Sequence, residues 1–198
     1  LAKQKNVPVK RVSLEALGSL CDHRNHQGAI CSRPQFRYSE LNEVLSSVKE
    51  KENSTIIRLD GIEDPVNFGS IIRSSTAFDV DAIIIGKNRQ VQVTATVSKI
   101  ATGGEEIIPI VQVTNLNQTI NTLKKNGYWV VSCAGEGKDV YDEIDYRGKI
   151  VLVIGSEGFG VSRLVRENSD FIASIPLPGK VKALNASIAA AVFLAQVN

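Results

Sequence analysis

The chain has 198 residues, of which 43% are hydrophobic and 22% charged, a composition typical of one globular domain with room for a smaller appendage. Its formal net charge of +2 is too small to identify a partner, although the first forty residues are locally basic, which suits phosphate contacts or simply a solvated basic face. No apolar run approaches the roughly 20 residues that span a bilayer, and the start lacks a secretory apolar core, so we expect a cytoplasmic protein without a membrane partner.

The first half of the chain begins with a short unit over residues 1–32, followed over residues 33–53 by a linker and a connecting helix. Ser39 can cap this helix, and its apolar positions repeat at helical spacing: Leu41, Val44, Leu45 and Val48. The chain contains no methionine, so we expect its N-terminus to be trimmed or incomplete.

Cysteines and histidines gather in the N-terminal unit. Cys21, His23, His26 and Cys31 lie close together, but their spacing matches no common zinc pattern, and we expect a turn with ordinary polar residues and no metal. With Cys133 the cysteines are odd in number, which disfavours a disulfide framework and fits a reducing compartment.

Short apolar runs then alternate with helical stretches, the pattern of an α/β domain over residues 54–198 with a mostly parallel sheet. Six strands are predicted, at Thr55–Leu59, Ala82–Ile85, Ile107–Val111, Tyr128–Ser132, Ile150–Ile154 and Phe171–Ile175. Helices are predicted at Phe68–Phe78, Thr94–Ala101, Leu116–Asn126, Ser162–Asn168 and Asn185–Val197. Asn115 is a candidate cap, and Gly103 and Gly127 stand where helices must end.

A first polar segment follows the first of these strands. Pro65 stiffens the turn, and Asn67 can cap a helix that starts at Phe68. Arg73 lies almost two turns into that helix among apolar neighbours, where it faces a cleft or an interface, or pairs with a surface acid.

A second segment, Gly155–Gly160, follows a buried strand directly, so its glycines occupy the crevice where open α/β sheets bind ligands. The order of its glycines is not that of a dinucleotide fingerprint, which disfavours a nucleotide-dependent oxidoreductase. Glu157 could serve a cationic ligand or a ribose, or cap the helix after Val161.

A third segment, Ile175–Ser187, turns through two prolines and a glycine and enters an alanine-rich final helix. Asn185 and Ser187 stand in its first turn, where backbone N–H groups are available to a ligand. The small residues of this helix allow another backbone or another subunit to approach, or simply make a good buried helix.

These three segments match, in order, the motifs of the SpoU (TrmH-like) family of SPOUT RNA ribose methyltransferases, which the chain resembles from about His26 to its end. N-x-G-x-x-x-R corresponds to Asn67, Gly69 and Arg73, and G-x-E-G-x-G to Gly155, Glu157, Gly158 and Gly160. The third motif corresponds to Ile175, Pro176, Leu177, Leu184, Asn185 and Ser187. One position departs from the pattern, because Ala183 stands where the family usually has serine.

The resemblance implies a C-terminal deep trefoil knot, S-adenosylmethionine as the cofactor, a homodimer and 2′-O-methylation of a ribose in structured RNA. The cofactor-binding residues carried over are Gly155, Glu157, Gly158, Ile175, Leu177 and Leu184, and the catalytic residues are Arg73, Asn67, Glu157 and Asn185. Arg73 would clamp the phosphate beside the reacting ribose rather than act as a base, because its pKa exceeds about 12.

The resemblance is closest to the ribosomal RNA branch of this family. The run His26-Gln27-Gly28 resembles the end of the RNA-binding domain that precedes the catalytic domain in that branch, so residues 1–32 are expected to be a shortened RNA substrate-binding unit. Large-subunit ribosomal RNA, at a guanosine, is the expected substrate. The alternatives are transfer RNA, or an RNA-binding paralogue that has lost catalysis and for which Ala183 is the only support.

Overall fold

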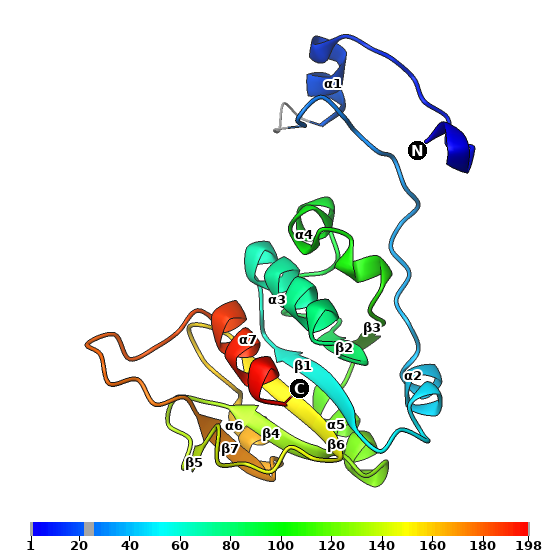
Figure 1. Cartoon of the computed structure of the whole chain (residues 1–198). Helices are drawn as coiled ribbons and strands as arrows, with labels where there is room; N and C mark the ends of the chain where they lie inside the picture. The colour runs from blue at the N-terminus through cyan, green and yellow to red at the C-terminus, as the bar shows by residue number, and fades with distance from the viewer. Residues whose placement is uncertain (1, 22–25, 198) are drawn as a thin grey trace. The chain divides into compact units, whose positions relative to one another are not determined.

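The structure, a computed structural model, describes residues 2–21 and 26–197 and divides into two compact units, Leu1–Phe36 and Arg37–Asn198 (Figure 1). The first unit contains a 3₁₀ turn, η1 (Lys3–Lys5), and one helix, α1 (Leu14–Leu20). Ser13 caps α1 by accepting a hydrogen bond from the Ala16 amide at 3.2 Å. The boundary at Phe36 lies inside the linker expected from the sequence, and the assignment of residues 1–32 to RNA binding stays a prediction.

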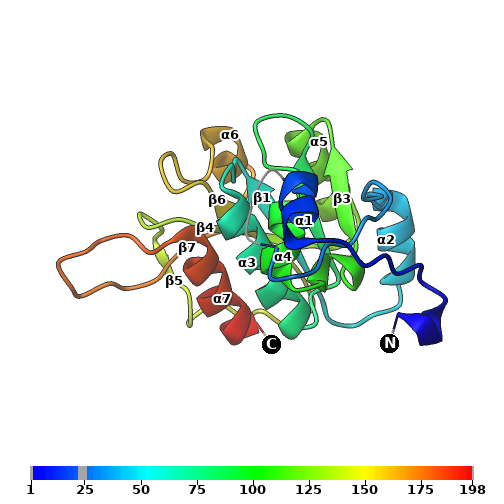
Figure 2. The ribbon, with the colours of Figure 1, turned by 90° about the horizontal axis from the view of Figure 1, so that it is seen from above.

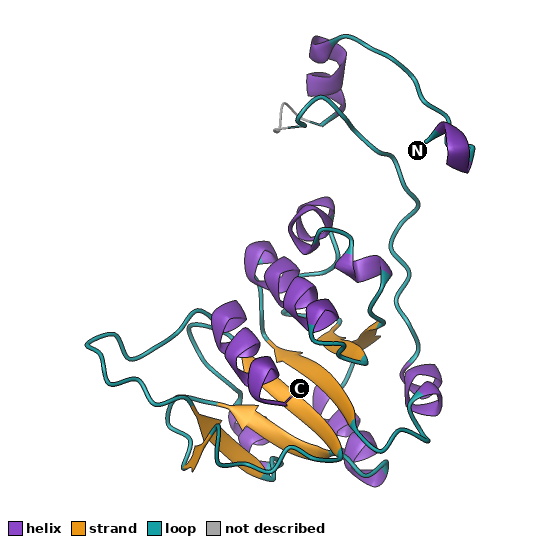
Figure 3. Ribbon diagram, viewed as in Figure 1, coloured by secondary structure: helices purple, strands orange, loops and turns teal. Residues whose placement is uncertain are grey.

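The described part of the second unit is built on one seven-stranded parallel sheet in the order β3-β2-β1-β6-β4-β7-β5 (Figure 3). Its strands are β1 (Ser54–Asp60), β2 (Ala82–Gly86), β3 (Ile110–Val113), β4 (Trp129–Cys133), β5 (Asp139–Val140), β6 (Lys149–Gly155) and β7 (Phe171–Ser174). The central strands β1, β2 and β6 are apolar and almost wholly buried, as strands covered on both faces must be. The predicted α/β class with a parallel sheet is confirmed.

Helices cover both faces of this sheet. They are α2 (Leu41–Ser47), α3 (Pro65–Ala77), α4 (Ala95–Ala101), α5 (Leu116–Lys125), α6 (Arg163–Glu167) and α7 (Ala186–Val197), with a 3₁₀ turn η2 (Gly104–Glu106). The view from above shows α3 and α7 side by side on one face and α5 and α6 on the other (Figure 2). Helix α4 packs on α3. None of the described helices is both long and apolar enough to cross a membrane.

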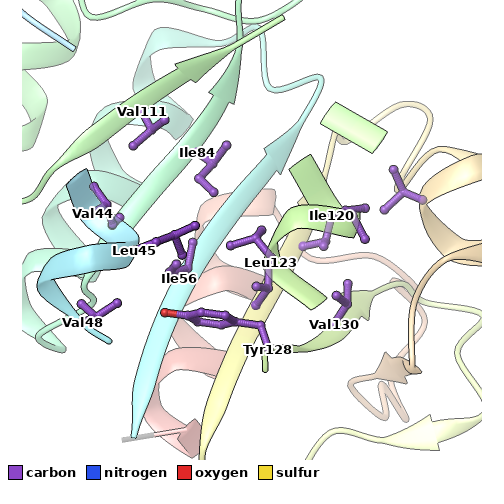
Figure 4. Close-up of a cluster of buried hydrophobic side chains, with 14 of the residues drawn as sticks. Val44, Leu45, Val48, Ile56, Ile84, Val111, Ile120, Leu123, Tyr128 and Val130 are labelled. Atoms are coloured by element: carbon purple, nitrogen blue, oxygen red, sulfur yellow. The ribbon is translucent and has the colours of Figure 1, made fainter. Parts of the chain in front are cut away.

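The main core lies between the sheet and the face covered by α2 and α5. Figure 4 shows Leu45 of α2 beside Ile56 of β1, with Ile120 and Leu123 of α5 on the same cluster. Each such side chain, when fully buried, contributes about 1.5–3 kcal/mol. The connecting helix predicted from the apolar repeat is therefore part of the core of the second unit.

Several element boundaries differ from those predicted. The sheet has a seventh strand, β5, which is too short for a periodic pattern to reveal. The strand predicted at Ile107–Val111 begins at Ile110, because Gly104–Glu106 forms a 3₁₀ turn and leaves Ile107 74% exposed. Ser39 does not cap α2; its amide instead donates to the Ile110 carbonyl at 2.8 Å, and Glu40 takes the cap position.

The strand order creates a crevice at the carboxyl ends of the central strands, which we call the carboxyl edge of the sheet. Strand β6 enters late in the chain between β1 and β4, so β1 and β6 run side by side from the pair Ser54 and Lys149 to the pair Asp60 and Gly155. Open α/β sheets bind ligands where the strand order reverses, outside the carboxyl ends of the strands. The trefoil knot expected around this edge stays a prediction.

Candidate active site

The three polar segments meet at the carboxyl edge of the sheet. The Asn67 side-chain nitrogen donates to Glu157 Oε1 at 2.9 Å. The Asn185 side-chain nitrogen donates to Asn67 Oδ1 at 2.8 Å and to Glu157 Oε1 at 2.5 Å. We call these three side chains the Asn67–Glu157–Asn185 cluster. It joins one residue from each segment, although the segments are far apart in sequence.

The sequence predicted that Asn67 caps its helix, and this prediction is wrong. Because Asn67 is not the cap residue, its side chain can reach the cluster. Helix α3 starts earlier, at Pro65, and the Asp64 carboxylate accepts the amides of Val66 and Asn67 at 3.2 and 3.0 Å. Proline fits the first turn of a helix because its missing N–H would have no partner there. With Asp64 as the cap, the Asn67 side chain, in a residue only 5% exposed, is free to bond Glu157.

Asn185 performs two tasks with one side chain. Its Oδ1 accepts the amides of Ser187 at 2.9 Å and Ile188 at 3.3 Å, and so caps α7, and it also accepts the Ser187 hydroxyl at 2.6 Å. Its amide nitrogen donates to Asn67 and Glu157. Because asparagine has an acceptor and a donor at the same end, it can cap the helix and join the cluster at once.

The loop that carries Glu157 folds back on itself. The Ser156 amide donates to the Gly160 carbonyl at 3.2 Å, and the Gly160 amide donates to the Ser156 carbonyl at 2.8 Å. A Cβ at Gly155 would lie 2.1 Å from the Gly160 carbonyl carbon, and Gly160 itself has φ +63°. Steric overlap therefore requires glycine at position 155, and the left-handed backbone favours glycine at position 160.

A cavity of about 170 Å³ lies beside this loop. Of the residues expected to bind cofactor, it is lined by Gly155, Glu157, Ile175, Leu177 and Leu184, whereas Gly158 does not line it. Ala183, where the family pattern has serine, is also in the lining. Ligand pockets commonly measure roughly 300–1,000 Å³, so part of a nucleoside-sized ligand would lie outside this cavity or displace its loops.

One wall of the cavity was not foreseen from the sequence. It comes from the carboxyl end of β4 and the turn after it, residues 133–136, and from Phe193 of α7. The glycine-containing run after a buried strand, Ala134-Gly135-Glu136-Gly137, is the signal that could have identified it, by analogy with the run after β6. Burial raises the pKa of the Cys133 thiol well above its ordinary value, which disfavours the reactive thiolate form of this lining residue.

Arg73 does not join the cluster. It lies on α3 six residues after Asn67, about 9 Å further along the helix axis and on another side of it. The residue is exposed, and within the described part of the chain it forms no ion pair, so it does not pair with a surface acid. Its guanidinium is available to an external anion.

Gly69, the remaining residue of the first motif, has a packing role. A Cβ there would lie 2.7 Å from the Ile100 Cβ and 2.9 Å from the Val97 carbonyl oxygen, both on α4. Glycine thus lets α4 approach α3 closely and fixes the helix that carries Asn67.

A larger cavity, of about 550 Å³, lies at the opposite edge of the sheet and is lined mainly by polar and charged residues, among them Lys51, Asp81 and Arg147. These charges are already paired, since Lys51 contacts Asp81 and Arg147 contacts Asp145. It lies at the amino ends of the strands, away from the crevice, and contains none of the motif residues. Within residues 2–21 and 26–197 no group of three or more His, Cys, Asp or Glu could hold a metal; His23 is outside those residues.

Comparison with known proteins points to one family. The model of the SpoU rRNA Methylase family matches residues 54–195. A protein of Staphylococcus saprophyticus assigned to the TrmH family of tRNA/rRNA methyltransferases is 42% identical over 198 residues, which is 100% of this chain and 79% of that protein. A Staphylococcus aureus protein of the same description is 41% identical over 197 residues, 99% of this chain and 79% of that protein.

Solved structures of such proteins share the fold. The SpoU methyltransferase AviRb from Streptomyces viridochromogenes, in complex with AdoMet, aligns with a TM-score of 0.74 at 24% identity, over 82% of this chain and 64% of AviRb. An AdoMet-bound rRNA methyltransferase from Sinorhizobium meliloti aligns with a TM-score of 0.79 at 25% identity, over 93% of this chain and 69% of that one. This chain therefore spans less than two thirds of AviRb.

Proposed function

Because this chain belongs to the SpoU rRNA methylase family of RNA methyltransferases, we propose that it transfers a methyl group from S-adenosylmethionine to the 2′-oxygen of a ribose in structured RNA. One observation carries the proposal. Three segments with the family's motif residues meet in the Asn67–Glu157–Asn185 cluster, beside a cavity at the carboxyl ends of parallel strands.

The cavity residues fit a nucleoside cofactor. Gly155 lines the cavity without a side chain, so a ligand can contact its bare backbone there. Ile175, Leu177 and Leu184 supply apolar contacts for a purine, and S-adenosylmethionine, when bound, supplies a methyl group already activated on a sulfonium. AviRb and the S. meliloti enzyme were both solved with AdoMet, which supports the same cofactor here.

The cluster itself acts by positioning. Glu157 accepts from two asparagine side chains and its carboxylate is thereby held between α3 and α7. Asn67 and Asn185 thus keep the cofactor loop in register with both helices, which places the methyl donor against the incoming ribose. Positioning of this kind can lower a displacement barrier by several kcal/mol, up to about 7–11 kcal/mol.

Arg73 acts on the substrate rather than on the cofactor. Its exposed guanidinium can bind the phosphate beside the reacting ribose bidentately, and its charge lowers the cost of forming an alkoxide at the 2′-oxygen. Arg73 does not touch the cluster, so in this proposal the RNA lies across α3 and spans the distance between Arg73 and the cluster.

We further propose that the enzyme works as a homodimer. Large apolar side chains stand exposed next to the cluster residues: Val66 beside Asn67 at 53%, Phe159 close to Glu157 at 97%, and Ile188 close to Asn185 at 54%. A second copy covering this surface would bury them.

The proposed substrate is large-subunit ribosomal RNA, modified at a guanosine. The N-terminal unit is 36 residues long, so an alignment over 93% of the chain must include part of it, and the protein aligned there is an rRNA methyltransferase. This supports reading the unit as an RNA substrate-binding element.

The proposal is tested by calorimetric titration with S-adenosylmethionine, followed by transfer of a labelled methyl group to unmodified 23S ribosomal RNA and, in parallel, to bulk transfer RNA, with nucleotide mapping. Binding with transfer to one ribosomal ribose is the expected result. Transfer to transfer RNA alone would replace the substrate, and absence of both binding and transfer would refute the enzyme. Binding without transfer to either RNA would indicate a paralogue without catalysis, and Ala183→Ser is then the first reversion to make.

A further inference from the structure

Asp60, the last residue of β1, contacts both ends of the loop that carries Glu157. Its backbone carbonyl accepts the Ser156 amide at 3.1 Å, where the loop begins. Its carboxylate Oδ2 accepts the Ser162 amide at 2.7 Å, where the loop ends and α6 starts. Ser162 is the N-cap residue of α6, so the Asp60 carboxylate holds the backbone at the point where the loop passes into this helix.

The carboxylate of Asp60 is oriented by a buried arginine on the same strand. Arg58 is 1% exposed, and its Nη2 lies 3.3 Å from Asp60 Oδ1. Residues two apart on a strand share a face, so Arg58 lies beneath Asp60 in the core. Burial lowers the pKa of the Arg58 guanidinium, and the neighbouring Asp60 carboxylate opposes this change.

The Arg58 guanidinium has few polar partners besides Asp60 within the described residues. Its Nε and Nη1 have no hydrogen-bond partner within the described residues, and Asp60 is the one acid with which it pairs there. A buried cation strongly favours the orientation that keeps its single counter-ion close. Asp60 therefore turns Oδ1 toward Arg58 and Oδ2 toward the Ser162 amide.

We propose that Asp60, oriented by Arg58, is a positioning residue that holds the loop 156–162 against Gly155 and so sets the place of Glu157 and the shape of the cofactor cavity. Neither Asp60 nor Arg58 lines that cavity, so both act through the loop. That the cavity takes S-adenosylmethionine rests on the proposed function; that Asp60 fixes the loop does not.

The test compares Asp60→Ala and Asp60→Asn with Asp81→Ala. Asp81 is a matched control, because its carboxylate also accepts a backbone amide, that of Thr55 at 3.0 Å, and pairs with a basic side chain, Lys51, but at the opposite edge of the sheet. Two readouts are taken on each full-length variant. Hydrogen exchange without ligand reports the amides of Ser156, Gly160 and Ser162, and calorimetry reports the Kd for S-adenosylmethionine.

Asp60→Ala should speed exchange at these three amides and raise the Kd by roughly 10-fold to 100-fold, the effect of one charge-assisted hydrogen bond. Asp60→Asn keeps an oxygen for the Ser162 amide but loses the attraction to Arg58, so its changes should be smaller and in the same direction. Asp81→Ala should lower the melting temperature and leave both readouts at the wild-type values.

Unchanged loop exchange in both Asp60 variants would overturn the proposal, and so would a rise in Kd in Asp81→Ala as large as that in Asp60→Ala. If Asp60→Ala does not fold, the isosteric Asp60→Asn decides by the same two readouts. If the wild type does not bind S-adenosylmethionine, the proposed function fails, and loop exchange alone still decides whether Asp60 fixes the loop.

Discussion

Substitution of Gly155 by alanine should uncouple the cofactor loop from the sheet. The added Cβ would lie 2.1 Å from the carbonyl carbon of Gly160 and 2.3 Å from the Val161 nitrogen, whereas ordinary contact begins at 3.4 Å. All of these neighbours are backbone atoms, so no side-chain rotation can relieve the overlap. The returning half of the loop must therefore move by more than 1 Å.

That displacement is large compared with the geometry of the site. Glu157 accepts from Asn185 at 2.5 Å and from Asn67 at 2.9 Å, and a shift of this size would stretch one or both contacts beyond hydrogen-bonding distance. A misplacement of about 1 Å can cost on the order of 100-fold in rate. Overpacking also destabilises a protein by about 1–3 kcal/mol, which lowers the melting temperature of a domain of this size by several degrees.

Calorimetric titration with S-adenosylmethionine, a methyl-transfer assay and a thermal melt on the same preparation measure these effects. Gly179→Ala is the matched control, because a Cβ at Gly179 meets nothing within 4 Å and its φ is not positive. We expect weakened binding and transfer reduced on the order of 100-fold in Gly155→Ala, and wild-type values in Gly179→Ala. Wild-type affinity and rate in Gly155→Ala would refute the steric reasoning.

Substitutions at three further positions test other parts of the site. Gly69→Ala should lower the melting temperature, because the new Cβ would lie 2.7 Å from Ile100 Cβ. The gain in helix propensity of about 1 kcal/mol offsets part of this loss. An unchanged melting temperature would contradict the close packing of α3 and α4. Asn185→Ala removes a helix cap worth about 1 kcal/mol and two contacts of the cluster, so its melting temperature should fall. Asn185→Asp should keep the cap but weaken calorimetric binding of S-adenosylmethionine, because the new carboxylate is repelled by Glu157. Arg73→Ala should abolish methyl transfer and leave the calorimetric Kd for S-adenosylmethionine nearly unchanged; a large loss of cofactor affinity would show that Arg73 has been given the wrong role.

The sequence predicted the sheet and the meeting of the three segments for physical reasons. Buried parallel strands are continuously apolar, and runs such as Ile150–Ile154 have no other place in a protein of this composition. Polar segments that follow such strands must then gather at one edge. Predicted helix ends were correct where only one nearby residue suited the position. Asn115 caps α5 by accepting the Gln118 amide at 3.0 Å, and Gly127 follows that helix with a positive φ.

Prediction failed where two residues compete or where distant parts of the chain meet. Asp64 and Asn67 are both good caps, and only the position of Pro65 decides between them. The wall formed by residues 133–136 borders the cavity because β4 lies next to β6, and no periodic pattern in a single sequence fixes which strands are neighbours. The exposure of Arg73 depends in the same way on how α3 packs, whereas its separation from Asn67 follows from their spacing on one helix.

The late entry of β6 has a consequence for how the protein is made. Strand β6, which pairs with β1, is synthesised only after almost half of the chain has been added beyond β1. At the start of this pair, the Gly148 amide donates to the side chain of Asn53, 95 residues away in sequence. Contacts between such distant residues slow folding, because the intervening chain must be ordered before they form. On the ribosome, β1 therefore waits with one edge unpaired, and the loop that carries Glu157 can settle only after its own strand has been inserted. A pause or truncation between residues 60 and 149 would leave an open sheet edge, the kind of surface that draws other chains into aggregates.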